Sequence, residues 1–151
     1  MCWWFTGRIG SGKTTLLRVL LGLLPKQTGA IYWNGKLVDD PANFFVPPRS
    51  AYTPQIPQLF SYSLQDNLLL GLDTRKIDLA KAIELAVFER DVADMPEGLL
   101  TLLGPKGVRL SGGQLQRAAA ARMFVRQPEL LIFDRKTRRK PLALDMGISR
   151  Q

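Results

Sequence analysis

The chain has 151 residues and a formal net charge of +8, with 46% hydrophobic and 23% charged residues. This composition is typical of a globular protein of one domain with a hydrophobic core, and a single cysteine excludes a disulfide framework. The most apolar run, residues 16–24, contains Arg18 and is shorter than the roughly 20 residues that span a bilayer. The N-terminus lacks the basic start and cleavage site of a signal peptide. We therefore expect a soluble domain facing the cytosol.

The positive charge is concentrated at the C-terminus. Residues 135–151 contain six basic residues and one acidic residue, so the first 134 residues carry a net charge of only +3. Basic runs that bind single-stranded nucleic acid usually alternate with aromatic side chains, and this one contains none. Nucleic-acid binding through the tail is therefore a third hypothesis, and no nucleic-acid partner is expected.

Residues 7–15, Gly-Arg-Ile-Gly-Ser-Gly-Lys-Thr-Thr, fit the pattern G-x-x-x-x-G-K-[ST] of a phosphate-binding loop, or Walker A motif. The glycines allow successive backbone N–H groups to point inward as an anion nest. The lysine brings a positive charge to the phosphates, and the hydroxyl of Thr14 is placed to bind Mg²⁺. The predicted phosphate-binding residues are Gly7, Gly10, Ser11, Gly12, Lys13, Thr14 and Thr15.

This motif has meaning only between a strand and a helix. Residues 3–6 predict a buried strand, and residues 14–24 predict a leucine-rich helix that stops at Pro25. The N-terminus of that helix would direct its dipole at the same phosphates. The alternative is a glycine-rich loop that precedes an ordinary helix by chance.

The next part of the chain predicts short strands. Asn34-Gly35 lies between apolar residues 30–33 and 36–38, which is the strongest short signal for a hairpin. Residues 41–48 predict a loop, with the apolar residues 44–46 against the body of the protein. Residues 50–53 predict a strand that ends at Pro54-Gln55, and Pro57 keeps the following stretch extended.

A helical section follows. Ser63 and Asp66 resemble a capping box that opens a helix to about Leu70. Asp78 is expected to cap a longer helix. Residues 91–95 are expected to form one more helical turn, and residues 99–103 are a short apolar run. The predicted apolar face of the longer helix consists of Leu79, Ala82, Ile83, Ala86 and Val87.

Two motifs near the end complete the pattern. Leu-Ser-Gly-Gly-Gln at 110–114 opens a helix that continues to about residues 126–127, with Ser111 as N-cap and bare N–H groups at the glycines. This is a second anion-binding helix end, although a capped surface helix with a flexible entry gives the same pattern. Residues 130–134 predict a buried parallel strand that delivers Asp134 to its C-terminal edge, where it can orient the Mg²⁺ shell.

The order of these motifs resembles the nucleotide-binding domain of ATP-binding cassette (ABC) transporters over about residues 3–134. The stretch 57–60 with Asn67 after it is similar to exporter-type members. The resemblance implies an α/β P-loop NTPase core of the RecA-like type. It also implies an inserted helical subdomain at about 62–127 within an ATP-binding domain of residues 1–134, followed by a basic tail at 135–151.

The resemblance also implies roles. Lys13, Thr14 and Thr15 hold the phosphates and Mg²⁺, and Gln55 reaches the Mg²⁺ and the attacking water while its loop touches the membrane partner. Asp134 binds Mg²⁺ through water. The signature residues cap the γ-phosphate held by a second such domain: Ser111, Gly112, Gly113 and Gln114. The implied cofactors are ATP and Mg²⁺. The implied partners are a second nucleotide-binding domain and transmembrane domains, at the cytoplasmic face of a membrane, where ATP hydrolysis drives transport.

The chain departs from the family at catalysis. Arg135 occupies the position of the catalytic glutamate that follows the Walker B aspartate, and an arginine cannot accept a proton from water. The chain contains no histidine to serve as the family's switch residue. We therefore expect impaired hydrolysis. The favoured explanation is a shifted reading frame or a misannotated end from Arg135 onward, on a gene truncated at both ends, because the earlier motifs are intact. The alternative is a degenerate domain that binds ATP without hydrolysing it.

Overall fold

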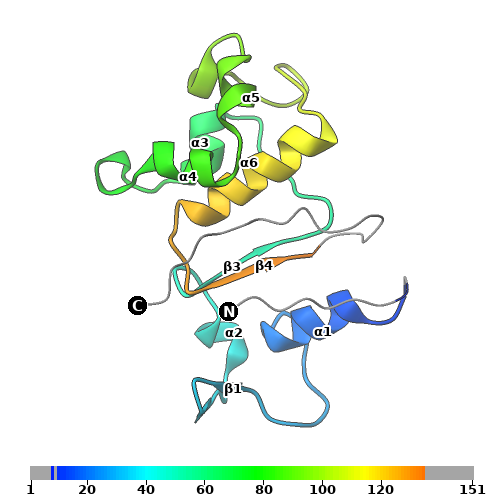
Figure 1. The fold of residues 1–151 in the computed structure, drawn as a ribbon. Helices are drawn as coiled ribbons and strands as arrows, with labels where there is room; N and C mark the ends of the chain where they lie inside the picture. Colours follow the sequence, from blue (N-terminus) through cyan, green and yellow to red (C-terminus); the bar gives the residue numbers. More distant parts are fainter. Residues whose placement is uncertain (1–7, 9, 135–151) are drawn as a thin grey trace.

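The computed structural model describes residue 8 and residues 10–134, in which helices lie on both sides of a pair of parallel strands (Figure 1). The predicted strand at 3–6 and the tail at 135–151 lie outside the described residues. The helices are α1 (Lys13–Leu20), α2 (Pro41–Phe44), α3 (Leu64–Leu69), α4 (Leu79–Leu85), α5 (Glu89–Ala93) and α6 (Gly112–Phe124), with 3₁₀ turns η1 (Thr74–Lys76) and η2 (Gly98–Leu100). The strands are β1 (Tyr32–Trp33), β2 (Lys36–Leu37), β3 (Ser50–Thr53) and β4 (Leu130–Phe133).

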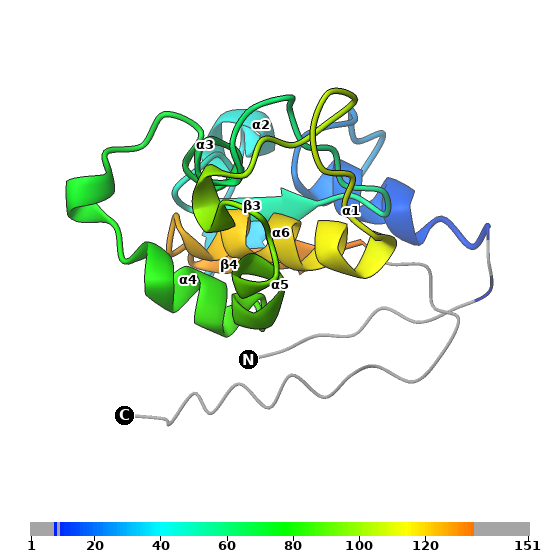
Figure 2. The same ribbon diagram turned by 90° about the horizontal axis from the view of Figure 1, so that it is seen from above.

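The parallel pair of β3 and β4 places two distant segments side by side. Ser50 is in register with Leu130 and Thr53 with Phe133, and the N–H of Asp134 donates to the carbonyl of Thr53 at 2.9 Å. Because the strands run in the same direction, the residues that follow them emerge at one edge. Figure 1 shows α6 on one side of this pair and α1 on the other, and Figure 2, seen from above, shows α6 lying over the strands. Both predicted strands are confirmed and run parallel, but β4 is half-buried rather than buried.

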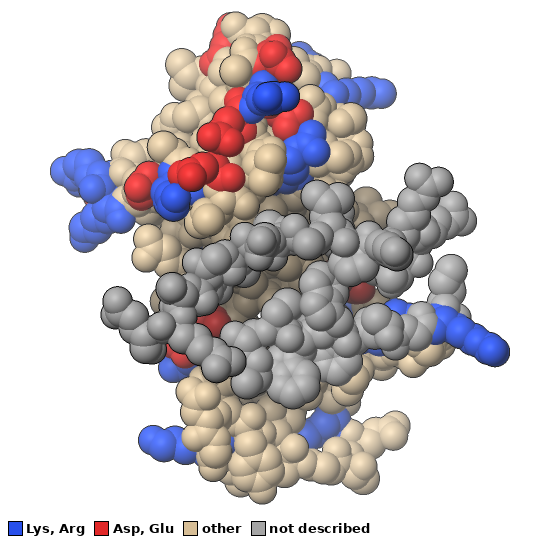
Figure 3. Space-filling view, in the orientation of Figure 1, with Lys and Arg blue, Asp and Glu red and all other residues tan. Residues whose placement is uncertain are grey.

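The main hydrophobic core lies among α3, α4 and α6. Leu64, Leu68 and Phe88 are at most 1% exposed, and they pack with alanines of α6 that are fully buried. Small alanine side chains let helices approach closely, which explains why a helix with four consecutive alanines lies in the middle of this cluster. On the face shown in Figure 3, acidic and basic side chains mix over the helical part of the molecule, as is typical of a solvated surface.

Local signals set several element boundaries as predicted. Ser63, Asp78 and Ser111 each accept a hydrogen bond from a backbone N–H in the first turn of α3, α4 and α6. In the β1–β2 hairpin, Asn34 and Gly35 both have positive φ, 49° and 78°. A two-residue turn with both φ positive matches the twist of the strands, so the hairpin prediction is confirmed.

Three predictions of local structure were wrong. The first helix ends at Leu20, because Gly22 takes a φ of 71° and leaves the helical path well before Pro25. Residues 41–48 are not wholly a loop, since α2 forms there with a proline at its start and Asp40 accepting from the N–H of Asn43 at 3.2 Å. Val87 is 68% exposed rather than on the apolar face, because α4 ends before it and its φ is 53°.

Candidate functional site

The loop before α1 has the backbone geometry of an anion nest. Gly10 and Gly12 have φ values of 84° and 82°, a conformation that side chains with a Cβ rarely adopt. A Cβ added at either glycine would meet no atom within 4 Å, so the backbone conformation and not the space requires glycine. Gly7, which the sequence places in the same loop, lies outside the described residues.

The start of α1 supplies donors and a positive charge. Gly12 is the N-cap, and no side chain of the described residues caps the helix there. The N-terminus of a helix favours a negative charge. The ammonium of Lys13 donates to the carbonyl oxygen of Arg8 at 2.8 Å and to the hydroxyl of Ser11 at 3.1 Å. The lysine charge therefore lies over the loop. Thr15 is exposed on the helix.

Three segments converge on the side chain of Gln55. Its amide nitrogen lies 3.5 Å from the hydroxyl oxygen of Thr14 and 3.5 Å from a carboxylate oxygen of Asp134. Thr14 is in the first turn of α1, Asp134 follows β4, and Gln55 follows β3. These contacts are long for hydrogen bonds, as is common where a ligand tightens the geometry. The parallel pairing of β3 and β4 brings these residues together.

Asp134 is held in a fixed orientation. It is 5% exposed, and its second carboxylate oxygen accepts a hydrogen bond from the hydroxyl of Tyr52 at 3.3 Å. Burial raises the pKa of Tyr52, a hydrogen bond from Arg18 opposes this, and the charge of Asp134 raises it further. The tyrosine hydroxyl consequently stays protonated at neutral pH and can donate to the carboxylate.

The donor set of this site fits Mg²⁺. The hydroxyl of Thr14 and the carboxylate of Asp134 are hard oxygen ligands, and the amide of Gln55 would contribute through its oxygen rather than the nitrogen that faces them here. Mg²⁺ is usually held by one or two carboxylates together with substrate phosphates. Among the residues that the structure describes, no cluster of three or more histidine, cysteine, aspartate or glutamate side chains forms a protein-only metal cage. The chemistry of Thr14, Gln55 and Asp134 beside a phosphate nest therefore suits a metal bound together with a nucleotide.

The signature residues lie apart from this cluster. Ser111, Gly112 and Gly113 are exposed at the start of α6, which lies on the other side of the strand pair from α1 (Figure 1). The side chains of Ser111 and Gln114 form a reciprocal capping box, with distances of 3.3 and 2.9 Å. In the described part of the chain, no hydrogen bond joins them to the phosphate loop. The chain thus presents two separate helix N-termini at the two predicted anion-binding motifs.

An ion pair supports the start of α6. The guanidinium of Arg117 donates to both carboxylate oxygens of Asp91 on α5, at 2.6 and 2.9 Å. The hydrogen bond from Arg117 holds the pKa of Asp91 below its usual value. A Cβ at Gly113 would lie 3.4 Å from an Arg117 nitrogen, so this charge sits directly beside the signature.

Sequence reasoning missed three residues around Gln55. Tyr52 contacts Asp134, and Gln116 and Arg122 of α6 donate to main-chain oxygens of the loop after β3. The available signal was an arginine within the alanine-rich, buried run of α6, because a buried cation needs polar partners. Arg135, the predicted substitute for the catalytic glutamate, lies outside the described residues.

Comparison with known proteins assigns the family. A model of the ABC transporter family matches residues 2–138, so the chain belongs to the ABC transporter family, and its function is that of the family's ATP-binding domain. The fold is accordingly that of a P-loop NTPase with mixed helices and strands.

Several relatives are similar over most of this chain. It is 40% identical over 129 residues to the Bacillus subtilis protein described as "Probable multidrug resistance ABC transporter ATP-binding/permease protein YheI", covering 85% of this chain and 22% of that protein. It is 38% identical over 134 residues to the ABC-type transmembrane transporter verA of Clonostachys rogersoniana, covering 87% and 11%. P-glycoprotein 14 of Caenorhabditis elegans is 36% identical to this chain over 132 residues, which cover 87% of this chain and 10% of that protein.

The chain spans only a part of each of these relatives: 22% of the length of the Bacillus protein, 11% of verA and 10% of P-glycoprotein 14. In the described residues, no helix combines the length and apolar character needed to cross a bilayer.

Proposed function

We propose that this chain binds Mg²⁺ and ATP through the loop at residues 10–15, and that the bound nucleotide lies at an interface with a second ATP-binding domain. The observation that carries the proposal is the convergence of Thr14, Gln55 and Asp134 beside an anion nest with Lys13 over it. Hard oxygen donors and a phosphate nest at one place suit a metal–nucleotide pair better than either ligand alone.

In this proposal one group of residues binds the phosphates and another binds Mg²⁺. Lys13 and the N–H groups of residues 10–15 bind the β- and γ-phosphates, with Gly7 completing the loop. Thr14, Gln55 and Asp134 hold Mg²⁺, which supplies charge neutralisation between the phosphates when it is bound. Thr14 does so directly, and Asp134 through water.

The second helix end accounts for a partner. Ser111, Gly112, Gly113 and Gln114 are proposed to cap the γ-phosphate of a nucleotide bound to another domain. Two observations support a contact with a second domain. Ser111, Gly112 and Gly113 are exposed, and α6 lies on the opposite side of the strand pair from α1. In architectural terms, we propose a RecA-like core with a helical subdomain at about residues 62–127.

We further propose that the parent protein couples ATP to transport. The relatives described as ATP-binding/permease and transmembrane transporter proteins support a partner made of membrane-spanning helices, with this domain at the cytoplasmic face of the membrane. The loop around Gln55 is the proposed contact with that partner.

Hydrolysis by this chain is proposed to be weak or absent. Arg135 stands directly after Asp134 where the family has its catalytic glutamate, and the chain has no histidine. A guanidinium cannot act as a general base at neutral pH. The chain is therefore proposed to bind ATP without hydrolysing it efficiently.

The test is an equilibrium titration with ATP, with and without Mg²⁺. Lys13→Ala is expected to weaken binding at least about tenfold, because it removes a charge-assisted contact to phosphate. Asp134→Asn is expected to remove the strengthening by Mg²⁺ while leaving metal-free ATP binding unchanged. The matched controls are Lys26→Ala and Asp39→Asn, both exposed positions away from the loop. Binding that is equal in wild type and Lys13→Ala would refute the proposal.

A further inference from the structure

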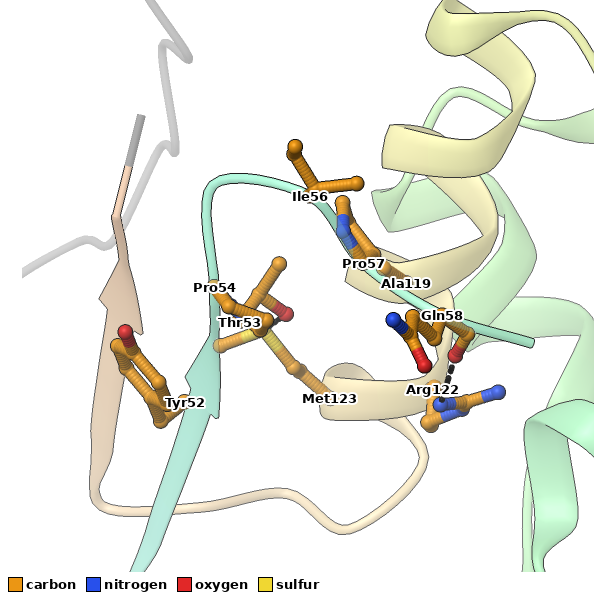
Figure 4. A pocket seen from close by; sticks show the side chains of 9 residues that line it. All are labelled: Tyr52, Thr53, Pro54, Ile56, Pro57, Gln58, Ala119, Arg122 and Met123. Carbon is orange, nitrogen blue, oxygen red and sulfur yellow. Dashed lines mark hydrogen bonds between the residues drawn. The ribbon is translucent and has the colours of Figure 1, made fainter. Parts of the chain in front are cut away.

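Helix α6 holds the loop that carries Gln55 at two points. We call residues 54–58 the Gln55 loop. The side-chain amide of Gln116 donates to the main-chain carbonyl of Gln55 at 3.1 Å, and the guanidinium of Arg122 donates to the carbonyl of Gln58 at 3.1 Å. Figure 4 shows the second contact, with Gln58 on the loop and Arg122 on the helix.

The second point of attachment is itself rigid. Arg122 also donates to the main-chain oxygen of Asn67 at 2.8 Å and to its side-chain oxygen at 3.2 Å. Asn67 is fully buried, and its amide donates to the carbonyls of Phe60 and Ser63 at 2.9 and 3.0 Å. A buried polar network with every member satisfied fixes its parts relative to one another. Arg122 therefore ties the end of the Gln55 loop to α3 and α6.

Gln116 contacts the other end of the Gln55 loop, at the main-chain carbonyl of Gln55 itself. Pro54 and Pro57 fix their own φ and restrict the residues before them, whereas residues 55 and 56 between them form a bend. A bond that fixes the Gln55 carbonyl fixes the orientation of that peptide. It anchors the backbone from which the Gln55 side chain extends between Thr14 and Asp134.

We propose that Gln116 is a positioning residue, which sets the Gln55 side chain between Thr14 and Asp134 through the Gln55 carbonyl. Helix α6 begins at Gly112, after its N-cap Ser111. The same element that presents the signature therefore also contacts the Gln55 loop, somewhat more than one turn further along. The metal-binding consequence rests on the proposed function, whereas the positioning itself does not.

The first measurement follows the Gln55 side-chain amide by solution NMR in the full chain without nucleotide. Gln116→Met keeps the length of the side chain and removes its donor. We expect the two Gln55 amide proton signals to move toward the values of a freely rotating glutamine. Gln65→Met makes the same change on half-buried Gln65 of α3 and is expected to leave them in place. Unchanged Gln55 signals in Gln116→Met would overturn the proposal.

The second measurement is the ratio of ATP affinities with and without Mg²⁺. Loss of one net hydrogen bond predicts that Gln116→Met lowers this ratio by about three- to tenfold. A purely structural role would weaken binding equally in both conditions. In a Gln55→Ala background, Gln116→Met is expected to have no further effect on the ratio, because the side chain that it positions is gone.

These outcomes separate the two proposals. Equal weakening with and without Mg²⁺, or an undiminished effect in the Gln55→Ala background, contradicts the positioning role. Failure of the wild-type chain to bind ATP refutes the proposed function, and the NMR comparison of Gln116→Met with Gln65→Met then decides the positioning role by itself.

Discussion

Glycines with the same backbone conformation have different reasons for being glycine. Gly10, Gly12, Gly22 and Gly29 all have φ between 71° and 88°. At Gly10, Gly12 and Gly29 a Cβ would meet no atom within 4 Å, so conformation alone favours glycine. At Gly22 a Cβ would also overlap the backbone of Ala42, so this position needs glycine for space as well.

This difference predicts the stability of two substitutions. Gly29→Ala is expected to lower the free energy of unfolding by about 1 kcal/mol, the cost of a left-handed conformation for alanine. Gly22→Ala adds a backbone overlap that cannot relax without moving α2, and the expected loss is at least about 3 kcal/mol. Urea denaturation of both variants measures the difference. Equal losses would show that Gly22 does not lie against the backbone of Ala42.

The same residue-level view explains how much of the site was predictable. The phosphate loop was readable because each residue type has a local reason, from glycine conformation to the lysine charge. The role of Tyr52 was not predictable, because its contact with Asp134 joins a residue of β3 to the residue that follows β4. A tyrosine in a strand is usually interpreted as a packing residue.

At the scale of elements, most of the correctly predicted boundaries are encoded locally. Ser63, Asp78 and Ser111 cap helices within three residues of themselves, and Asn34-Gly35 encodes its own turn. The end of α1 is also local, because Gly22 takes a left-handed conformation directly after the C-cap Leu21. The prediction placed this end at Pro25, although the glycine gave the earlier stop signal.

The α5–α6 contact predicts a pH dependence. The pKa of Asp91 is lowered by Arg117, so its stabilising effect is complete above the unfolded-state pKa of about 3.9 and is lost as the pH falls through the lower folded-state pKa. Asp91→Asn is expected to cost about 1 kcal/mol at pH 7, since the pair is partly exposed to solvent.

The expected difference between Asp91→Asn and wild type shrinks as the pH falls below about 3.9. Unfolding by urea at pH 7 and at two acidic pH values measures it. Asp94→Asn, at the exposed end of the same helix, is the control and is expected to show no such trend. A difference that stays constant with pH would mean that the ion pair does not stabilise the fold.

At the scale of the whole molecule, the topology assembles the site. Thr14, Gln55 and Asp134 are spread over 121 positions and meet because β3 and β4 are parallel and α1 lies beside them. The sequence predicted that the last two follow strands, and the resemblance to the family joined them to the loop. The partners of α6 in the Gln55 loop were not predictable, because they are main-chain oxygens; only Arg122, a cation within an apolar run, indicated that polar partners must exist.

The two separate helix ends predict association that depends on ATP. A Cβ at Gly112 would meet nothing within 4 Å, so Gly112→Glu is expected to leave the unfolding midpoint unchanged. It would place a carboxylate against the γ-phosphate of a partner. In sedimentation experiments with Mg²⁺ and ATP, wild type is expected to form dimers and Gly112→Glu to remain monomeric with unchanged ATP affinity. Dimers of the variant would contradict binding in trans.

The central claim is that the chain holds ATP but lacks the group that cuts it. Phosphate release at saturating Mg²⁺ and ATP tests this most directly, in wild type and in Lys13→Ala. We predict that wild type releases phosphate no faster than Lys13→Ala, although only wild type binds the nucleotide. Robust phosphate release by the wild-type chain that Lys13→Ala abolishes would contradict the account.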